Sequence, residues 1–157
     1  MQAGHLDWLT ETLAQHLAEA LELMTGEAPQ VAWTTSETPV SQEPLAWWSQ
    51  GFNLEPGALL WIGAPETSWR KIGEHVLGAA GISPAGDDEI KNTYQEILGQ
   101  ALASLARSLS TRLNREVACE EAREQPPPED VPIQALVDLT LGESARLSVW
   151  VAFSPVL

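Results

Sequence analysis

The stretch from Asp87 to Leu113 constrains the fold of this chain most, because its apolar residues recur at helical spacing. Three acidic residues, Asp87 to Glu89, suit the positive N-terminal end of a helix. The apolar face contains Ile90, Tyr94, Ile97, Leu98, Ala101, Leu105 and Leu109. Such a stripe needs an apolar surface to cover it, so the chain must fold in layers.

The opposite face of this expected helix has an unusual composition. Solvent-facing helix surfaces usually carry long charged side chains, whereas this one carries two carboxylates, an amide and then small residues: Glu89, Asn92, Glu96, Gly99, Ala103 and Ser110. Glycine within a helix costs about 1 kcal/mol relative to alanine, so some contact should favour Gly99. Two interpretations are open, namely internal helix–helix packing and a docking surface for a partner protein.

The rest of the chain predicts a second long helix and several extended segments. Apolar residues between Leu6 and Met24 form a stripe that Gly26 ends, and Thr67 is expected to cap a short helix through Leu77. Strands are expected at 30–36, 44–53, 58–62, 115–121, 132–141 and 145–153, with a loop at 37–44 and hairpin turns at 54–57 and 142–144. We therefore predict one domain over residues 1–157 with an α/β fold of the mixed α+β type. It has a mainly antiparallel sheet and two long helices packed on one face.

Charge and cysteine content exclude several classes of function. The formal net charge is −14, so nucleic acid and anionic membrane surfaces should repel the chain. Solubility or a partner with a positive rim would explain such a charge. Cys119 is alone, which is consistent with a reducing cytoplasm, and we expect it to be a buried strand residue. No apolar run approaches the roughly 18 residues that a membrane span needs.

Signals for most enzymes are absent, and the tryptophans are numerous. His5, His16 and His75 lie in separate segments without metal-ligand spacing, so we expect no metal site. No phosphate-binding glycine loop or nucleophile elbow occurs. Among the seven tryptophans, extended apolar segments place three in the core: Trp33, Trp61 and Trp150. Three others are candidates for exposed interface residues: Trp8, Trp47 and Trp48.

The order of the elements resembles the CheC/CheX/FliY family of chemotaxis phosphatases related to flagellar switch proteins, and so does the pattern of Glu96-Ile97, five further residues and then Ala103. The resemblance covers nearly the whole chain, is strongest to CheX in the order of elements, and implies a curved sheet. The active helix of that family carries Asp or Ser, then Glu four positions later, Asn three further on, and a later Pro. The corresponding residues here are Asn92, Glu96, Gly99 and Ala122, so only the Glu is kept.

The resemblance implies a substrate and roles for these residues. The family acts on the phosphorylated aspartate of a CheY-type response regulator, whose receiver domain carries the Mg²⁺, so this chain needs no cofactor of its own. The family's Glu pairs with a lysine of the regulator, and its Asn positions the attacking water. Gly99 has no side chain to do this. Glu89 and Asn92 repeat the Glu-x-x-Asn spacing two turns earlier and could form a displaced site.

Three functions remain open from the sequence. The first is a cytoplasmic module that binds a receiver domain, with weak or no phosphatase activity, through Glu96, Gly99 and Ala103. The second is an active aspartyl-phosphate phosphatase that uses Glu89, Asn92 or Glu96. The third is a structural relative of the flagellar switch proteins. Formation of a homodimer is also left open.

Overall fold

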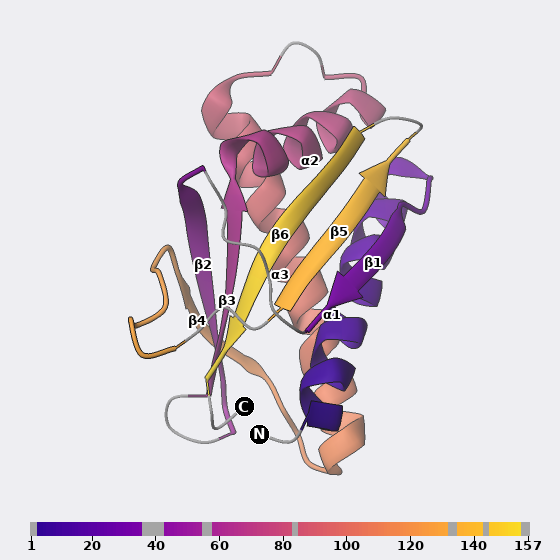
Figure 1. Ribbon diagram of the computed structural model, residues 1–157. Helices are drawn as coiled ribbons and strands as arrows, with labels where there is room; N and C mark the ends of the chain where they lie inside the picture. Colours follow the sequence, from indigo (N-terminus) through magenta and orange to yellow (C-terminus); the bar gives the residue numbers. More distant parts are fainter. Residues whose placement is uncertain are drawn as a thin grey trace.

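In the computed structural model, three helices pack against a six-stranded antiparallel sheet within the residues that the structure describes, which are 3–35, 43–54, 58–82, 85–131, 135–142 and 145–154 (Figure 1). The helices are α1 (Ala3–Thr25), α2 (Glu66–Ala79) and α3 (Asp87–Leu113). The strands are β1 (Gln30–Thr34), β2 (Leu45–Phe52), β3 (Leu59–Pro65), β4 (Cys119–Arg123), β5 (Ala135–Leu141) and β6 (Ala145–Phe153). The mixed α+β class and the antiparallel sheet are confirmed.

The strand order reveals two equivalent halves. It is β1-β5-β6-β3-β2-β4, and every neighbouring pair is antiparallel. Exchanging β1, β2 and β3 with β4, β5 and β6 reproduces the same order in reverse. The segments α1-β1-β2-β3 and α3-β4-β5-β6 are therefore related by a topological twofold between β3 and β6. The sequence shows no repeat that would have predicted this relation.

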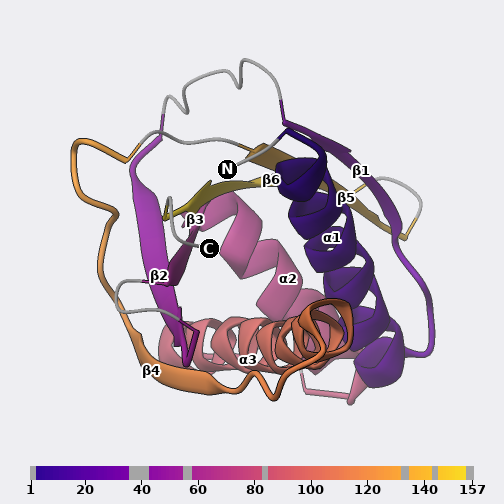
Figure 2. The same cartoon turned by 90° about the horizontal axis from the view of Figure 1, so that it is seen from below.

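The two long helices lie antiparallel across one face of the sheet. The ring nitrogen Nε2 of His16 lies 2.8 Å from the Ser108 hydroxyl, and Met24 near the end of α1 contacts Gln100 near the middle of α3. Figure 2 shows the sheet curving around the helices from β1 to β4. Both apolar stripes face this interior, and the core includes fully buried leucines from each helix: Leu9, Leu13, Leu98, Leu102 and Leu105.

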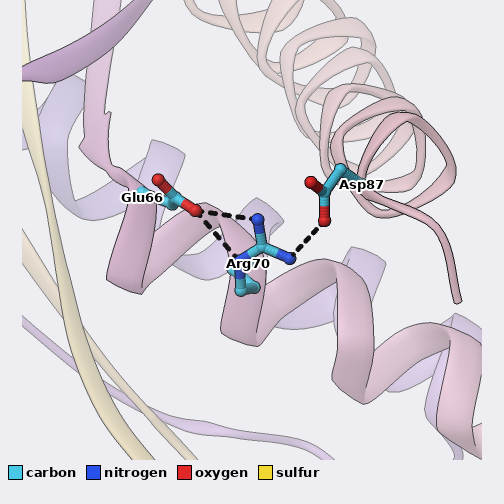
Figure 3. A network of polar contacts seen from close by, with 3 residues as sticks. All are labelled: Glu66, Arg70 and Asp87. Atoms are coloured by element: carbon cyan, nitrogen blue, oxygen red, sulfur yellow. Dashed lines mark hydrogen bonds and ion pairs between the residues drawn. The ribbon is translucent and has the colours of Figure 1, made fainter. Parts of the chain in front are cut away.

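Helix α2 fixes the N-terminal half of α3. An added Cβ at Gly73 would lie 2.3 Å from the carbonyl oxygen of Ile90, so only glycine permits this close approach. The guanidinium of Arg70 donates to Glu66 at 2.7 Å and to Asp87 at 2.9 Å (Figure 3). These contacts raise the pKa of Arg70 and fasten the first turn of α3 to α2.

Several expected boundaries are wrong; β3, for example, extends to Pro65 rather than ending at 62. Thr67 does not cap α2, because the helix begins at Glu66 and the Thr67 hydroxyl donates to Glu43 instead. The strand expected at 115–121 runs from Cys119 to Arg123. The reason is that side chains take the earlier backbone N–H groups: the Ser110 hydroxyl accepts from Val117, and the Asn53 side chain accepts from Ala118. The expected turns at 54–57 and 142–144, the loop at 37–44 and the start of the strand at 132 fall partly outside the described residues.

The burial expected for the tryptophans and for Cys119 is only partly confirmed. Trp61 and Trp150 are buried as expected, but Trp33 on the edge strand β1 is only half-buried. Cys119 lies on the other edge strand, β4, and is exposed rather than buried, although partial desolvation raises the pKa of its thiol. Trp8 is half-buried, because the guanidinium of Arg112 lies 4.4 Å from its ring centroid.

Candidate functional site

The polar residues of α3 singled out from the sequence lie together on its outer surface. Glu89, Asn92, Glu96 and Gly99 are all exposed, and we call these four residues the acidic face of α3. Spacings of three or four residues place neighbouring members one turn apart on the same side of the helix. Met24, near the end of α1, contacts Gln100, the residue that follows Gly99. Helix α1 therefore ends beside Gly99 and does not extend over the acidic face.

The side chains of the acidic face have no partners within the described part of the chain. Glu89, Asn92 and Glu96 form no side-chain hydrogen bond or ion pair there, in contrast to Asp87, which pairs with Arg70, and Glu124, which lies 3.9 Å from Lys91. A carboxylate that is neither paired nor buried can accept a cation from another molecule without first losing an internal contact. The acidic face can therefore receive a Lys or Arg side chain.

Gly99 adds room for a close approach. A Cβ built at this position meets no atom within 4 Å, so packing against another described element does not explain the glycine. No described residue packs on Gly99, whereas a close helix contact lies at Gly73. Only a backbone or side chain from outside the described residues could use the space above Gly99.

Ala103 occupies a different setting from Gly99. It is half-buried and lines a groove of about 340 Å³ between α1 and α3, next to Leu23, whose side chain is 78% exposed. The groove is also lined by Glu19, Ala20, Gln100, Ser104 and Arg107. This groove continues from the acidic face toward the C-terminal half of α3, so an approaching protein could contact both.

The geometry limits the chemistry of the acidic face. Asn92 lies one turn before Glu96, while the position one turn after Glu96 is Gly99, which has no amide to hold a water molecule. Ala122, at the position of the family's Pro, is half-buried on β4 opposite Gln50. Among the described residues, no three His, Cys, Asp or Glu side chains are placed to hold a metal ion, and no helix is long and apolar enough to cross a membrane.

Sequence reasoning missed a second cavity on the neighbouring side of α3. It has a volume of about 260 Å³ and lies between α3, the start of β2 and the segment after β4. Tyr94 and Trp48 both line it. The stripe pattern assigned Tyr94 to the core, and nothing in the sequence indicates that β2 brings Trp48 to the same place.

Neither a known protein family nor a curated protein sequence matches this chain. Solved structures do share its fold. FliY from Thermotoga maritima has a TM-score of 0.67 at 13% identity, covering 99% of this chain and 92% of that chain. A chain of the FliG–FliM complex from H. pylori has a TM-score of 0.67 at 11% identity, covering 99% and 96%. CheX from Desulfovibrio desulfuricans has a TM-score of 0.64 at 9% identity, covering 93% and 99%. The CheC/CheX/FliY-like fold expected from the sequence is thus confirmed.

Proposed function

We propose that this chain is a chemotaxis or two-component signalling protein that binds the receiver domain of a response regulator through the acidic face of α3. The observation that carries this proposal is Glu96, an exposed carboxylate without a partner among the described residues, one turn from the open space above Gly99. The fold shared with CheX and FliY supports it.

The charge of the molecule supports a partner with a positive rim. The formal net charge of −14 attracts a basic surface over long distances and raises the association rate. Glu96 then offers a specific contact to a lysine of the receiver, the role that the family resemblance gives to this position. Any Mg²⁺ at the phosphoryl group would be carried by the receiver.

Phosphatase activity should be weak or absent. Orientation of a nucleophile can contribute several kcal/mol to a rate, and Gly99 stands where the related enzymes have the Asn that orients the water. We expect little release of phosphate from a phosphorylated receiver and an increase with Gly99→Asn. Rapid release by the unchanged chain, unaffected by Asn92→Ala, would contradict this.

A displaced catalytic site is the second candidate. It is favoured by Asn92, whose exposed amide has no hydrogen-bond partner in the described parts and lies one turn from both Glu89 and Glu96. In this case the unchanged chain would release phosphate rapidly, and Asn92→Ala would abolish the release. Glu74→Ala, on the exposed side of α2, is a matched surface control.

A role in a flagellar switch is the third candidate. It is favoured by the equal TM-scores of FliY and of the chain from the FliG–FliM complex. Binding to a flagellar rotor protein, together with no binding to receiver domains from the same genome, would favour this role over the first proposal.

The binding proposal makes a quantitative prediction. Truncating one side of a partly desolvated charge pair at an interface centre costs about 2 kcal/mol, which is roughly a thirtyfold loss of affinity. We therefore expect Glu96→Ala to weaken receiver binding by this factor in a calorimetric titration, whereas Glu74→Ala leaves it unchanged. Equal affinity of both variants and the unchanged chain would place the interface elsewhere.

A second variant tests the groove beside the acidic face. Ala103→Trp places a bulky ring in the space between Leu23 and Arg107, where it blocks close approach of a partner. We expect weaker receiver binding without loss of stability, because Ala103 is half-buried and faces an open groove. Unchanged binding would restrict the interface to the acidic face.

A further inference from the structure

The charges of α3 are separated along its length. From Ile97 to Leu113 the helix carries arginines and no acidic residue, whereas the part before Ile97 is acidic apart from one lysine: Asp87, Asp88, Glu89, Lys91 and Glu96. Two such helices from separate molecules attract each other when they lie antiparallel, because each acidic part then faces a basic part. A parallel pair would bring like charges together. Helix α3 is therefore complementary to a second copy of itself in the antiparallel orientation.

Glu96 and Arg107 are the charged residues that carry this complementarity. Both are exposed, and neither has an ion-pair partner in the described part of the chain. The guanidinium of Arg107 donates to the Ser104 hydroxyl at 2.8 Å, a contact that leaves its positive charge unpaired. The two residues lie about three helical turns apart, so their side chains project from the same side of α3. This side can therefore offer both a carboxylate and a guanidinium to another molecule.

The helix surface between these two charges is low. Gly99 and Ala103 lie there, about one turn apart on the same side of α3. A Cβ built at Gly99 meets no atom within 4 Å, and Ala103 borders the groove of about 340 Å³ that Leu23 also lines. The distance between packed helices depends on the side chains at the contact, so these small residues let a second helix come close. Leu23, which is 78% exposed, offers apolar surface for that helix to cover.

We propose that two copies of this chain form a dimer in which their α3 helices pack antiparallel, about a twofold axis that passes beside Gly99 and Ala103. This arrangement places Glu96 of each copy opposite Arg107 of the partner subunit, so the same ion pair forms twice. Such an interface uses the same patch on both copies and closes after two subunits. In Figure 2, α3 runs along the margin of the molecule between α1 and β4, where a second copy can approach it.

The dimer should be weak and reversible. One helix pair and Leu23 form a small contact, for which we expect a dissociation constant on the order of micromolar. The net charge of −14 on each copy opposes association. A Debye length of about 8 Å at about 0.15 M salt screens this overall repulsion more than it weakens the contacts between adjacent groups. In submicromolar solution the chain is then a monomer, and unfolding measured there reports the single chain.

Dimer formation would regulate the acidic face, a consequence that rests on the proposed function. The second copy covers Glu96, so a receiver domain that uses this carboxylate binds the monomer alone. Receiver binding and self-association then compete by mass action. Self-association is measured without any receiver, so its failure and the failure of receiver binding are separate results.

The experiment is analytical ultracentrifugation of the full chain from micromolar to millimolar concentration, with exchanged charges. Glu96→Arg sets two arginines opposite each other in the dimer, and Arg107→Glu sets two carboxylates opposite each other. We expect each variant alone to associate at least ten times more weakly than the unchanged chain. A mixture of the two variants should form a heterodimer, because each supplies the charge that the other lacks. The double variant should dimerise by itself, with both pairs reversed, and should not bind a receiver.

Matched controls keep the result specific. Glu74→Arg and Lys71→Glu make the same changes of net charge on the exposed side of α2, so neither should alter the dimer. Melting curves of the single variants in dilute solution should match that of the unchanged chain, because both changed residues are exposed. A chain that stays monomeric at millimolar concentration would overturn the proposal. Folded single variants that dimerise like the unchanged chain, or whose mixture fails to associate, would overturn it as well.

Discussion

At the scale of single residues, two helical glycines have opposite roles. Gly99 faces open space, so a methyl group there costs no contact and lowers the entropy of the unfolded chain. We expect Gly99→Ala to raise the free energy of unfolding by up to about 1 kcal/mol, measured by urea denaturation. A loss of stability would show that another segment or a second copy of the chain packs on this position.

Gly73 should behave in the opposite way. Its added Cβ would lie 2.3 Å from the backbone carbonyl oxygen of Ile90, and a backbone atom cannot rotate aside as a side chain would. We expect Gly73→Ala to force α2 and α3 apart and to lower the free energy of unfolding by about 1–3 kcal/mol. An unchanged urea midpoint would mean that the two helices can separate at little cost.

At the scale of elements, the helices could be predicted from the sequence, but the bounds of the edge strand β4 could not. The stripe in α3 predicted its bounds, because ten of its residues are buried at helical spacing. The start of β4 depends on the side chains of Ser110 and Asn53, which accept from the backbone N–H groups of Val117 and Ala118 just before the strand. Asn53 lies 65 residues away from Ala118 in the sequence. Periodicity predicted that Glu96 is exposed, but it could not predict that Trp48 and Tyr94 line the same cavity.

The ion pairs between α2 and α3 give a prediction at this scale. Arg70 joins Glu66 on its own helix to Asp87 at the start of α3, on the protein surface (Figure 3). We expect Arg70→Met to lower the melting temperature slightly, and the difference to shrink as the Debye length falls from about 30 Å at about 0.01 M salt to about 3 Å at about 1 M. Lys71→Met is the control, and a difference independent of salt would mean that Arg70 acts through packing on Trp69.

At the scale of the whole molecule, the net charge opposes folding and favours association with a basic partner. Twenty-two acidic residues face eight lysines and arginines, so the folded chain holds like charges close together. We expect the melting temperature of the chain to rise as sodium chloride increases toward about 0.15 M, because screening weakens this repulsion. The same screening should weaken binding to a receiver domain, so stability and affinity should change in opposite directions over one salt series. A melting temperature that falls with salt would show that attractive pairs such as those of Arg70 outweigh the net repulsion.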